Sequence, residues 1–161
     1  MTISFNSPCP LSNIMNSLRS ILLLSGLLVL AAVAADKSPD SGVIHLDHAK
    51  VDAMFAKGGS LLATNNFKVM ALRRDAPGEV EIHDRDTDIV YVLEGSANFV
   101  TGGEAKESRT TAPGETRAKN IAGGEERHLV KGDVVVVPNR VPHWFKEVNG
   151  PFLYFVVKVS Q

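Results

Sequence analysis

The sequence predicts an all-β fold, a small sandwich or barrel preceded by one short helix. Short runs rich in β-branched and aromatic residues recur along the chain, and turn residues separate them. Two of these runs, residues 134–137 and 152–157, are continuously apolar, which is typical of strands buried on both faces. With 161 residues and no internal repeat, the chain has the length of a single domain.

Residues 1–35 have the pattern of a secretory signal peptide. Arg19 precedes an apolar run, 21–35, whose small residues Ala-Val-Ala resemble a cleavage site. An uncleaved membrane anchor is the alternative interpretation, although the run is short for a transmembrane span. We expect cleavage near Ala34 or Ala35, and a periplasmic or secreted protein without stable membrane association.

The start of the chain raises two further points. Met15 begins a more typical signal peptide than Met1 does, so the true start codon is open between the two. The one cysteine of the sequence, Cys9, precedes the apolar run and would be lost with the signal. Its loss would exclude disulfides, cysteine catalysis and thiolate metal sites from the mature protein.

The charge balance argues against a polyanionic partner. The chain has 17 basic and 18 acidic side chains, so its formal net charge is −1. Because no excess of positive charge is present, we expect no binding to nucleic acid.

Residues 36–65 form an N-terminal leader with two predicted elements. A short apolar run at 43–46 predicts an edge strand. Residues 48–56 have apolar positions at helical spacing, and two glycines follow, so this segment predicts a helix.

Residues 66–161 contain the predicted barrel. Gly95 and Ser96 predict a hairpin turn between two strands, and the polar, glycine-containing stretch 102–126 predicts a long loop or insertion. The predicted strands are 67–72, 80–83, 89–93, 97–101, 128–130, 133–137, 143–148 and 152–159.

Several of these strands have side chains of the types that can bind metals. Glu81 and His83 are two residues apart, so on a strand both point to one face. His143, Phe145 and Glu147 share a face for the same reason. Two histidines and a carboxylate inside a barrel are the set that an open-sided metal centre requires.

The residues around Glu81 resemble a known motif. Glu81, one residue, His83, four residues, Asp88, six residues and Gly95 match the spacing of the first cupin motif. The family motif has His-x-His, then Glu, then Gly. In this chain Glu81 replaces the first histidine of the motif, and Asp88, which has a shorter side chain, replaces the glutamate.

A second stretch resembles the second cupin motif. Gly132, Pro138 and His143 stand at the family spacing, with Arg140 where the family usually has glycine. Glu147 replaces the asparagine that often closes this motif.

The cupin resemblance covers residues 66–159, and it implies a fold and a cofactor. The implied fold is a single-domain double-stranded β-helix, or jelly-roll barrel. The implied cofactor is one divalent metal ion, with Fe, Mn, Zn, Ni and Cu all open. The implied ligands are Glu81, His83, Asp88 and His143.

Three roles are open for Glu81, where the chain departs from the family. It could be a fourth ligand, through its carboxylate oxygen. It could be a catalytic general base beside the metal. The third interpretation is a site that has lost its metal.

A substrate pocket is expected beside the predicted metal. Strand parity places Val90, Val92, Phe145 and Glu147 around it, which would suit a small organic molecule. The alternative, at least for the two valines, is packing of the barrel interior.

For some other basic residues, the sequence leaves open whether the side chain faces the pocket or the surface. Arg73 and Lys68 could bind a substrate carboxylate if their strand faces inward, although such residues are more often at the surface. His45, His48 and His128 fall outside both motifs, and we interpret them as surface or loop residues.

Three functions are compatible with this pattern. The leading hypothesis is a metal-dependent enzyme, of oxygenase type, that acts on a small organic substrate. A metal-assisted isomerase or lyase is the first alternative, and a non-catalytic cupin that binds a sugar or metabolite is the second. Cupins often dimerise by strand exchange, so residues 43–46 could join a homodimer.

Overall fold

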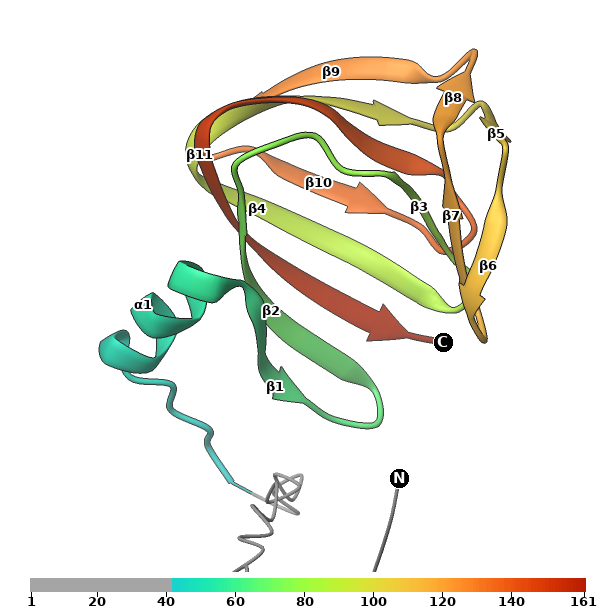
Figure 1. Ribbon diagram of the computed structural model, residues 1–161. Coiled ribbons are helices and arrows are strands. Elements are labelled where there is room, and N and C mark those ends of the chain that lie inside the picture. Colours follow the sequence, from blue (N-terminus) through green and yellow to red (C-terminus); the bar gives the residue numbers. More distant parts are fainter. Residues whose placement is uncertain (1–41) are drawn as a thin grey trace, which may run out of the picture. The chain divides into compact units, whose positions relative to one another are not determined.

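The computed structural model describes residues 42–161, which form antiparallel sheets and one helix (Figure 1). The predicted signal peptide, its cleavage junction and Cys9 lie outside the described residues. Within residues 42–161, no helix is long and apolar enough to cross a membrane. In chain order the elements are α1 (His48–Lys57), β1 (Gly59–Ala63), β2 (Phe67–Arg74), β3 (Val80–His83), β4 (Asp86–Thr101), β5 (Glu104–Lys106), β6 (Arg109–Ala112), β7 (Glu115–Ala118), β8 (Asn120–Ala122), β9 (Glu125–Val130), β10 (Val134–Val137) and β11 (His143–Ser160).

The two longest strands, β4 and β11, pair with each other along most of their length and organise the barrel. Strand β11 also pairs with β2 and β3, while β4 also pairs with β9 and β10. The strands curl around a common interior, with β5–β8 at one end and α1 near the other (Figure 1). The predicted all-β fold, a double-stranded β-helix, is therefore confirmed.

The helix α1 agrees with its prediction, but the strand expected before it does not form. The Asp47 side chain accepts a hydrogen bond from the Lys50 amide at the start of α1, and Gly58, with φ +70°, ends it. Phe55 on α1 packs against Phe155 of β11, with ring centroids 5.1 Å apart. Residues 43–46 have no strand conformation, and β1 takes the edge position beside β2 instead.

Strand β4 continues past Gly95 without reversing direction, so the hairpin turn predicted there does not form. Its first half pairs with the end of β11 and its second half with the beginning of β11. Gly95 has φ +75°, and a Cβ there would lie 2.6 Å from the carbonyl oxygen of Pro151. The glycine therefore allows a close approach at an irregularity in β11, and not a reversal of the chain.

The stretch 102–126 is also different from its prediction, because it contains four short strands and the start of β9. Strand β7 pairs with β3 and β6, and β5 pairs with β8. All four side chains of β6 are exposed, as are most side chains of β9. Exposed strands lack the apolar alternation that reveals a strand in a sequence, which explains the error.

The core lies between the facing strands and is rich in aromatic side chains. Phe99, Phe145, Phe152 and Tyr154 form a cluster with ring centroids 4.5–5.4 Å apart. Ten buried residues make up the core cluster: Val90, Val92, Ala97, Phe99, Leu129, Val137, Phe145, Phe152, Tyr154 and Val156.

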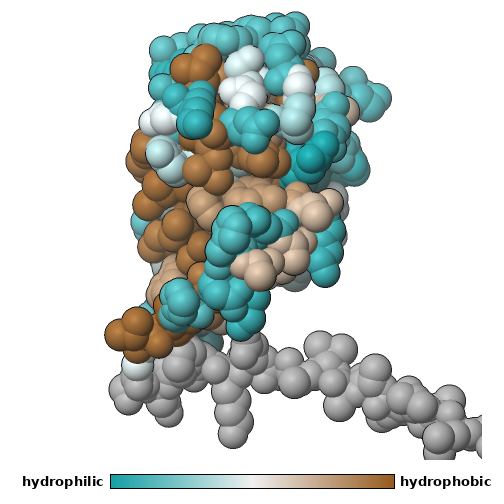
Figure 2. All heavy atoms as spheres, turned by 90° about the vertical axis from the view of Figure 1, so that its left-hand side faces the viewer, coloured by the Kyte–Doolittle hydropathy of each residue, from teal (hydrophilic) through white to brown (hydrophobic). Residues whose placement is uncertain are grey.

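The valines of β10 are buried on one face only, so the prediction of burial on both faces is wrong for this strand. Val137 is 2% exposed, whereas Val134 and Val136 are 60% and 57% exposed. Within the described residues β10 pairs only with β4, so it is an edge strand, and its outward-facing valines are exposed to solvent. Figure 2 shows hydrophobic side chains gathered along one side of the molecular surface.

Candidate metal centre

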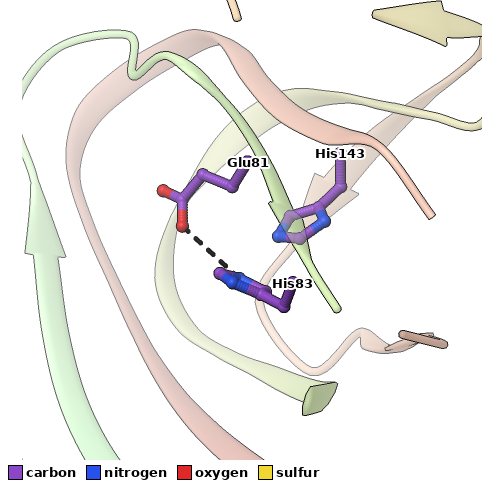
Figure 3. Close-up of side chains that lie close together, drawn as sticks. All are labelled: Glu81, His83 and His143. Atoms are coloured by element: carbon purple, nitrogen blue, oxygen red, sulfur yellow. Dashed lines mark ion pairs between the residues drawn. The ribbon is translucent and has the colours of Figure 1, made fainter. Parts of the chain in front are cut away.

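Strand register brings the predicted ligands together. Glu81 on β3 is the direct cross-strand partner of His143 on β11. Asp88 on β4 is the partner of Lys158, at the other end of β11. Opposite residues on one face of an antiparallel pair have adjacent side chains. Glu81, His83 and His143 consequently point toward one another in the barrel interior (Figure 3).

Both histidines present the Nε2 atom to this cluster. The Nδ1 of His143 lies 3.0 Å from the carbonyl oxygen of Val141, an acceptor, so Nδ1 carries the proton. The Nδ1 of His83 donates in the same way to Glu115 Oε2 at 2.9 Å. In both neutral rings the lone pair is then on Nε2, which is the arrangement of a metal ligand.

The spacing of these side chains fits a divalent ion. One ligand atom from each of Glu81, His83 and His143 lies within 4.8 Å of the other two. Metal–ligand distances of about 2.0–2.2 Å put ligand atoms roughly 3–4.4 Å apart around one ion, so only small adjustments are needed. Two imidazoles and a carboxylate suit iron, manganese, zinc, nickel or copper.

Asp88 lies beside this set, where a basic side chain holds it. Its Oδ2 is 3.5 Å from His83 Nε2 and 3.7 Å from His143 Nε2. Both carboxylate oxygens accept hydrogen bonds from Lys158 Nζ at 2.8 Å. Asp88 is 5% exposed, so its charge depends on this compensation.

Burial and neighbouring charges have opposite effects on the pKa values in this cluster. Burial lowers the pKa of His143 below its usual value. Burial also acts to lower the pKa of His83, but its contact with the Asp88 carboxylate and the charges of Asp88 and Glu115 raise it overall. The pKa of Asp88 is lowered, because contacts with His83 and Lys158 outweigh the effect of its burial.

Two arginines flank Glu81. Arg74 Nη2 donates to Glu81 Oε1 at 3.0 Å, and Arg117 Nη2 lies 3.6 Å from Oε2. Oε2 is also 3.7 Å from His83 Nε2, so this oxygen is the one on the side of the histidines (Figure 3). Arg74 Nε also donates to the hydroxyl of Tyr154 at 2.8 Å.

A cavity of about 280 Å³ opens beside the cluster. Of the four predicted pocket residues, Val90 and Phe145 line it. Val92 belongs to the packed core instead. Glu147 is exposed and accepts a hydrogen bond from Asn98 at 2.7 Å, because a bulge between Phe145 and Glu147 breaks the strand parity.

Two basic residues of β2 considered for substrate binding, Arg73 and Lys68, are exposed, which agrees with the surface alternative. Arg74 lines the cavity, whereas Arg73 pairs with Asp75 at the surface. Lys68 is exposed and borders a separate pocket of about 230 Å³. The three histidines outside the motifs are all exposed: His45, His48 and His128.

Sequence reasoning missed Lys158, Glu115, Arg117 and Arg74. Lys158 had a detectable signal, since it continues the inward positions of Tyr154 and Val156 at a spacing of two. Glu115 and Arg117 had none, because they lie in the stretch interpreted as a loop.

The similarity to known proteins extends over most of the described residues. A family model described as Cupin matches residues 45–161. A search of curated proteins found no match.

Solved structures resemble the chain in fold at low sequence identity. A protein from Bacillus halodurans has a TM-score of 0.54 and 15% identity, covering 78% of this chain and 86% of its own. A Klebsiella pneumoniae protein with a double-stranded β-helix domain has a TM-score of 0.49 and 19% identity, covering 74% and 90%. A cupin protein from Bacteroides fragilis has a TM-score of 0.46 and 14% identity, covering 74% and 82%.

Proposed function

The chain belongs to the cupin family, and we propose that it is a metal-dependent enzyme acting on a small organic substrate. The observation that carries the proposal is the orientation of the two histidines. His83 and His143 both present Nε2 toward the Glu81 carboxylate, in a buried cluster next to a cavity. Such a site is built for a cation and leaves one side accessible to a substrate.

An oxygenase-type reaction is the form of this function that the ligand set supports best. Two histidines and one carboxylate, with open positions, are the ligands of non-haem iron oxygenases. A bound divalent ion would supply a Lewis acid and, if redox-active, dioxygen chemistry. The protein side chains would orient the substrate, and Glu115 and Val141 would hold the two imidazoles in place.

The cavity supports a substrate with an apolar body. Met70, Leu72, Val90, Phe145 and Val156 form its apolar wall, and the charged side chains gather around the metal cluster. At about 280 Å³ it is at the small end of ligand pockets.

A metal-assisted isomerase or lyase is the second candidate, and a specific observation favours it. Glu81, Lys158 and Tyr154 border the same cavity and can each exchange a proton. Proton transfer next to a polarised carbonyl needs such groups, whereas oxygenation does not require them. A cupin that binds a metabolite without turnover is the third candidate.

Metal analysis and nitric oxide binding test the proposal together. The purified full chain should contain about one divalent ion, and His83→Ala or His143→Ala should remove it while the fold is kept. His128→Ala, at an exposed histidine, is the matched control. In the iron-loaded protein, nitric oxide should bind the iron and give a paramagnetic signal, since an open position is required for dioxygen. Iron that does not react with nitric oxide would exclude the oxygenase form, and metal retained in the double alanine variant would exclude the centre itself.

We also propose that the protein is exported, because residues 1–35 have the three parts of a signal peptide. The intact mass of the exported protein should correspond to a start near Ala35 or Asp36. A mature protein that retains residues 21–30 would support a membrane anchor instead.

A further inference from the structure

Lys158 is the charged side chain closest to the proposed metal centre. It stands on β11 between Asp88 of β4 and Lys68 of β2, its two cross-strand partners. Its side chain is only 14% exposed, and it continues the inward face formed by Tyr154 and Val156. A lysine in this position has to be compensated by its neighbours.

The contacts of the Lys158 ammonium satisfy all of its donors. Nζ lies 2.8 Å from Asp88 Oδ1, 2.8 Å from Asp88 Oδ2 and 2.8 Å from His83 Nε2. An ammonium has three N–H donors, and here it has three acceptors at hydrogen-bond distance. Two of the side chains that the cupin resemblance assigns to the metal are therefore bound by a cationic group of the chain itself.

The hydrogen bond to His83 and a metal ion on His83 exclude each other. A neutral imidazole has a single acceptor nitrogen, and the Nδ1 proton of His83 is directed to Glu115. The one lone pair on Nε2 can therefore face either the ammonium or a metal ion. Repulsion between a divalent ion and an ammonium a few ångströms away adds to this exclusion.

From this geometry we propose that Lys158 is a built-in competitor of the metal ion. Its ammonium holds His83 and Asp88 together when the centre is empty, and it must withdraw from His83 when an ion binds there. The inference rests on the metal centre proposed above and adds a determinant of its affinity. Withdrawal of Lys158 also releases Asp88, which can then become a fourth ligand beside Glu81, His83 and His143.

Removal of the competitor should strengthen metal binding. Lys158→Met keeps the length of the side chain and removes its charge. We expect Zn²⁺ to bind this variant about tenfold more tightly or better than the wild-type chain, measured by calorimetry with a competing chelator. Without metal, the variant should melt at a lower temperature than wild type, because Asp88 loses its counter-charge. Added Zn²⁺ should raise the melting temperature of the variant by more than it raises that of wild type. Lys68→Met, at the exposed cross-strand neighbour, should change neither quantity.

A second measurement uses the wild-type chain and does not depend on how the variant folds. With chelator present, Lys158 should react slowly with limiting acetic anhydride, and added Zn²⁺ should make it clearly more reactive, as read by peptide mass spectrometry. Lys68 should react equally in both conditions.

The possible results separate the two proposals. Equal or weaker Zn²⁺ binding by Lys158→Met, or unchanged labelling of Lys158 in zinc-loaded wild type, overturns the inference and leaves the metal centre in place. Zn²⁺ binding by the variant but not by wild type supports the inference in its strongest form. If neither protein binds Zn²⁺, the metal centre is wrong, and the inference fails with it.

Discussion

Glu115 stands directly opposite His83 in the β3–β7 pair and accepts a hydrogen bond from its Nδ1 at 2.9 Å. The same carboxylate oxygen lies 3.2 Å from Arg117 Nη1, so Glu115 is itself fixed in place. The contact selects the tautomer that puts the lone pair of His83 on Nε2, where it faces Lys158 or, in its place, a metal ion. A carboxylate behind a histidine ligand also increases the basicity of the ring.

Glu115→Gln should therefore weaken metal binding without unfolding the barrel. An amide is a weaker partner for Nδ1–H and can also reverse its orientation, so we expect affinity for Zn²⁺ or Co²⁺ to fall about 10–100-fold. Calorimetry on the full chain measures the change, and Glu126→Gln is the control, since Glu126 pairs with Lys146 at the surface. Equal affinity in wild type and Glu115→Gln would mean that Glu115 has no part in the centre.

Glu115 also illustrates which parts of the site the sequence could predict. Glu81, His83 and His143 were found because strand parity and motif spacing are local properties. Glu115 comes from β7, whose place beside β3 depends on long-range pairing inside a polar stretch. Nothing in residues 102–126 indicates which strand would be its neighbour.

The fold shows the same division between local and long-range information. The helix at 48–57 and strand β3 at 80–83 follow from local spacing, and both were predicted closely. The prediction of a hairpin turn at Gly95 was wrong, because a glycine with positive φ has the same local sequence pattern in a hairpin and at a close contact between strands. Only the approach of Pro151 from β11 distinguishes the two cases.

The ionisation of the buried Tyr154 phenol should make the stability of the protein depend on pH in the alkaline range. Burial raises the pKa of its phenol above the usual value, although Arg74 acts in the opposite direction. The folded chain thus keeps the proton to higher pH than the unfolded chain, whose tyrosines ionise near about 10. The stability that follows is present below pH 10 and is lost as the pH rises through the folded-state pKa.

Ultraviolet absorbance can follow this ionisation directly. The sequence has two tyrosines, so in Tyr91→Phe the signal comes from Tyr154 alone. We expect its midpoint above 10 in the folded protein and near about 10 in denaturant. Tyr154→Phe should melt with less dependence on pH in the alkaline range. A folded-state midpoint at or below the denatured value would contradict the burial of the phenol.

Gly78→Ala should displace Arg74 while the barrel stays folded. A Cβ at Gly78 would lie 2.4 Å from Arg74 Nη1, and the Gly78 carbonyl is held by the Trp144 indole at 2.7 Å. The end of the flexible arginine must therefore move, which costs roughly 1 kcal/mol or less in stability. Because Arg74 lowers the pKa of Tyr154, its displacement should raise that pKa further in the absorbance titration.

The control for Gly78→Ala is Gly42→Ala, since a Cβ at Gly42 has no neighbour within 4 Å among the described residues. This variant should leave both the melting temperature and the Tyr154 titration unchanged. If Gly78→Ala behaves in the same way, Arg74 does not contact the tyrosine as described.

Glu81 is the position where the chain departs most from its family, and its two oxygens have different surroundings. Arg74 donates to Oε1 at 3.0 Å, whereas Oε2 faces His83 Nε2 at 3.7 Å. Oε1 thus accepts a hydrogen bond from Arg74, whereas Oε2 has only a longer contact with Arg117, at 3.6 Å, and lies on the side of the centre. This arrangement suits a ligand that binds through a single oxygen, and we favour that role over a general base.

Glu81→Gln should distinguish the two roles. For a ligand, the neutral amide should weaken metal affinity clearly, because it is a poorer donor to a cation. For a general base, the metal should remain and turnover should fall by roughly a hundredfold or more. Glu81→His, the family residue, should favour metals that prefer imidazole in either case, and only the ligand role lets it keep appreciable activity. Glu79→Gln, at an exposed carboxylate paired with Arg109, is the control. Wild-type metal content and wild-type activity in Glu81→Gln would refute both roles, since the carboxylate charge would then have no function at the centre.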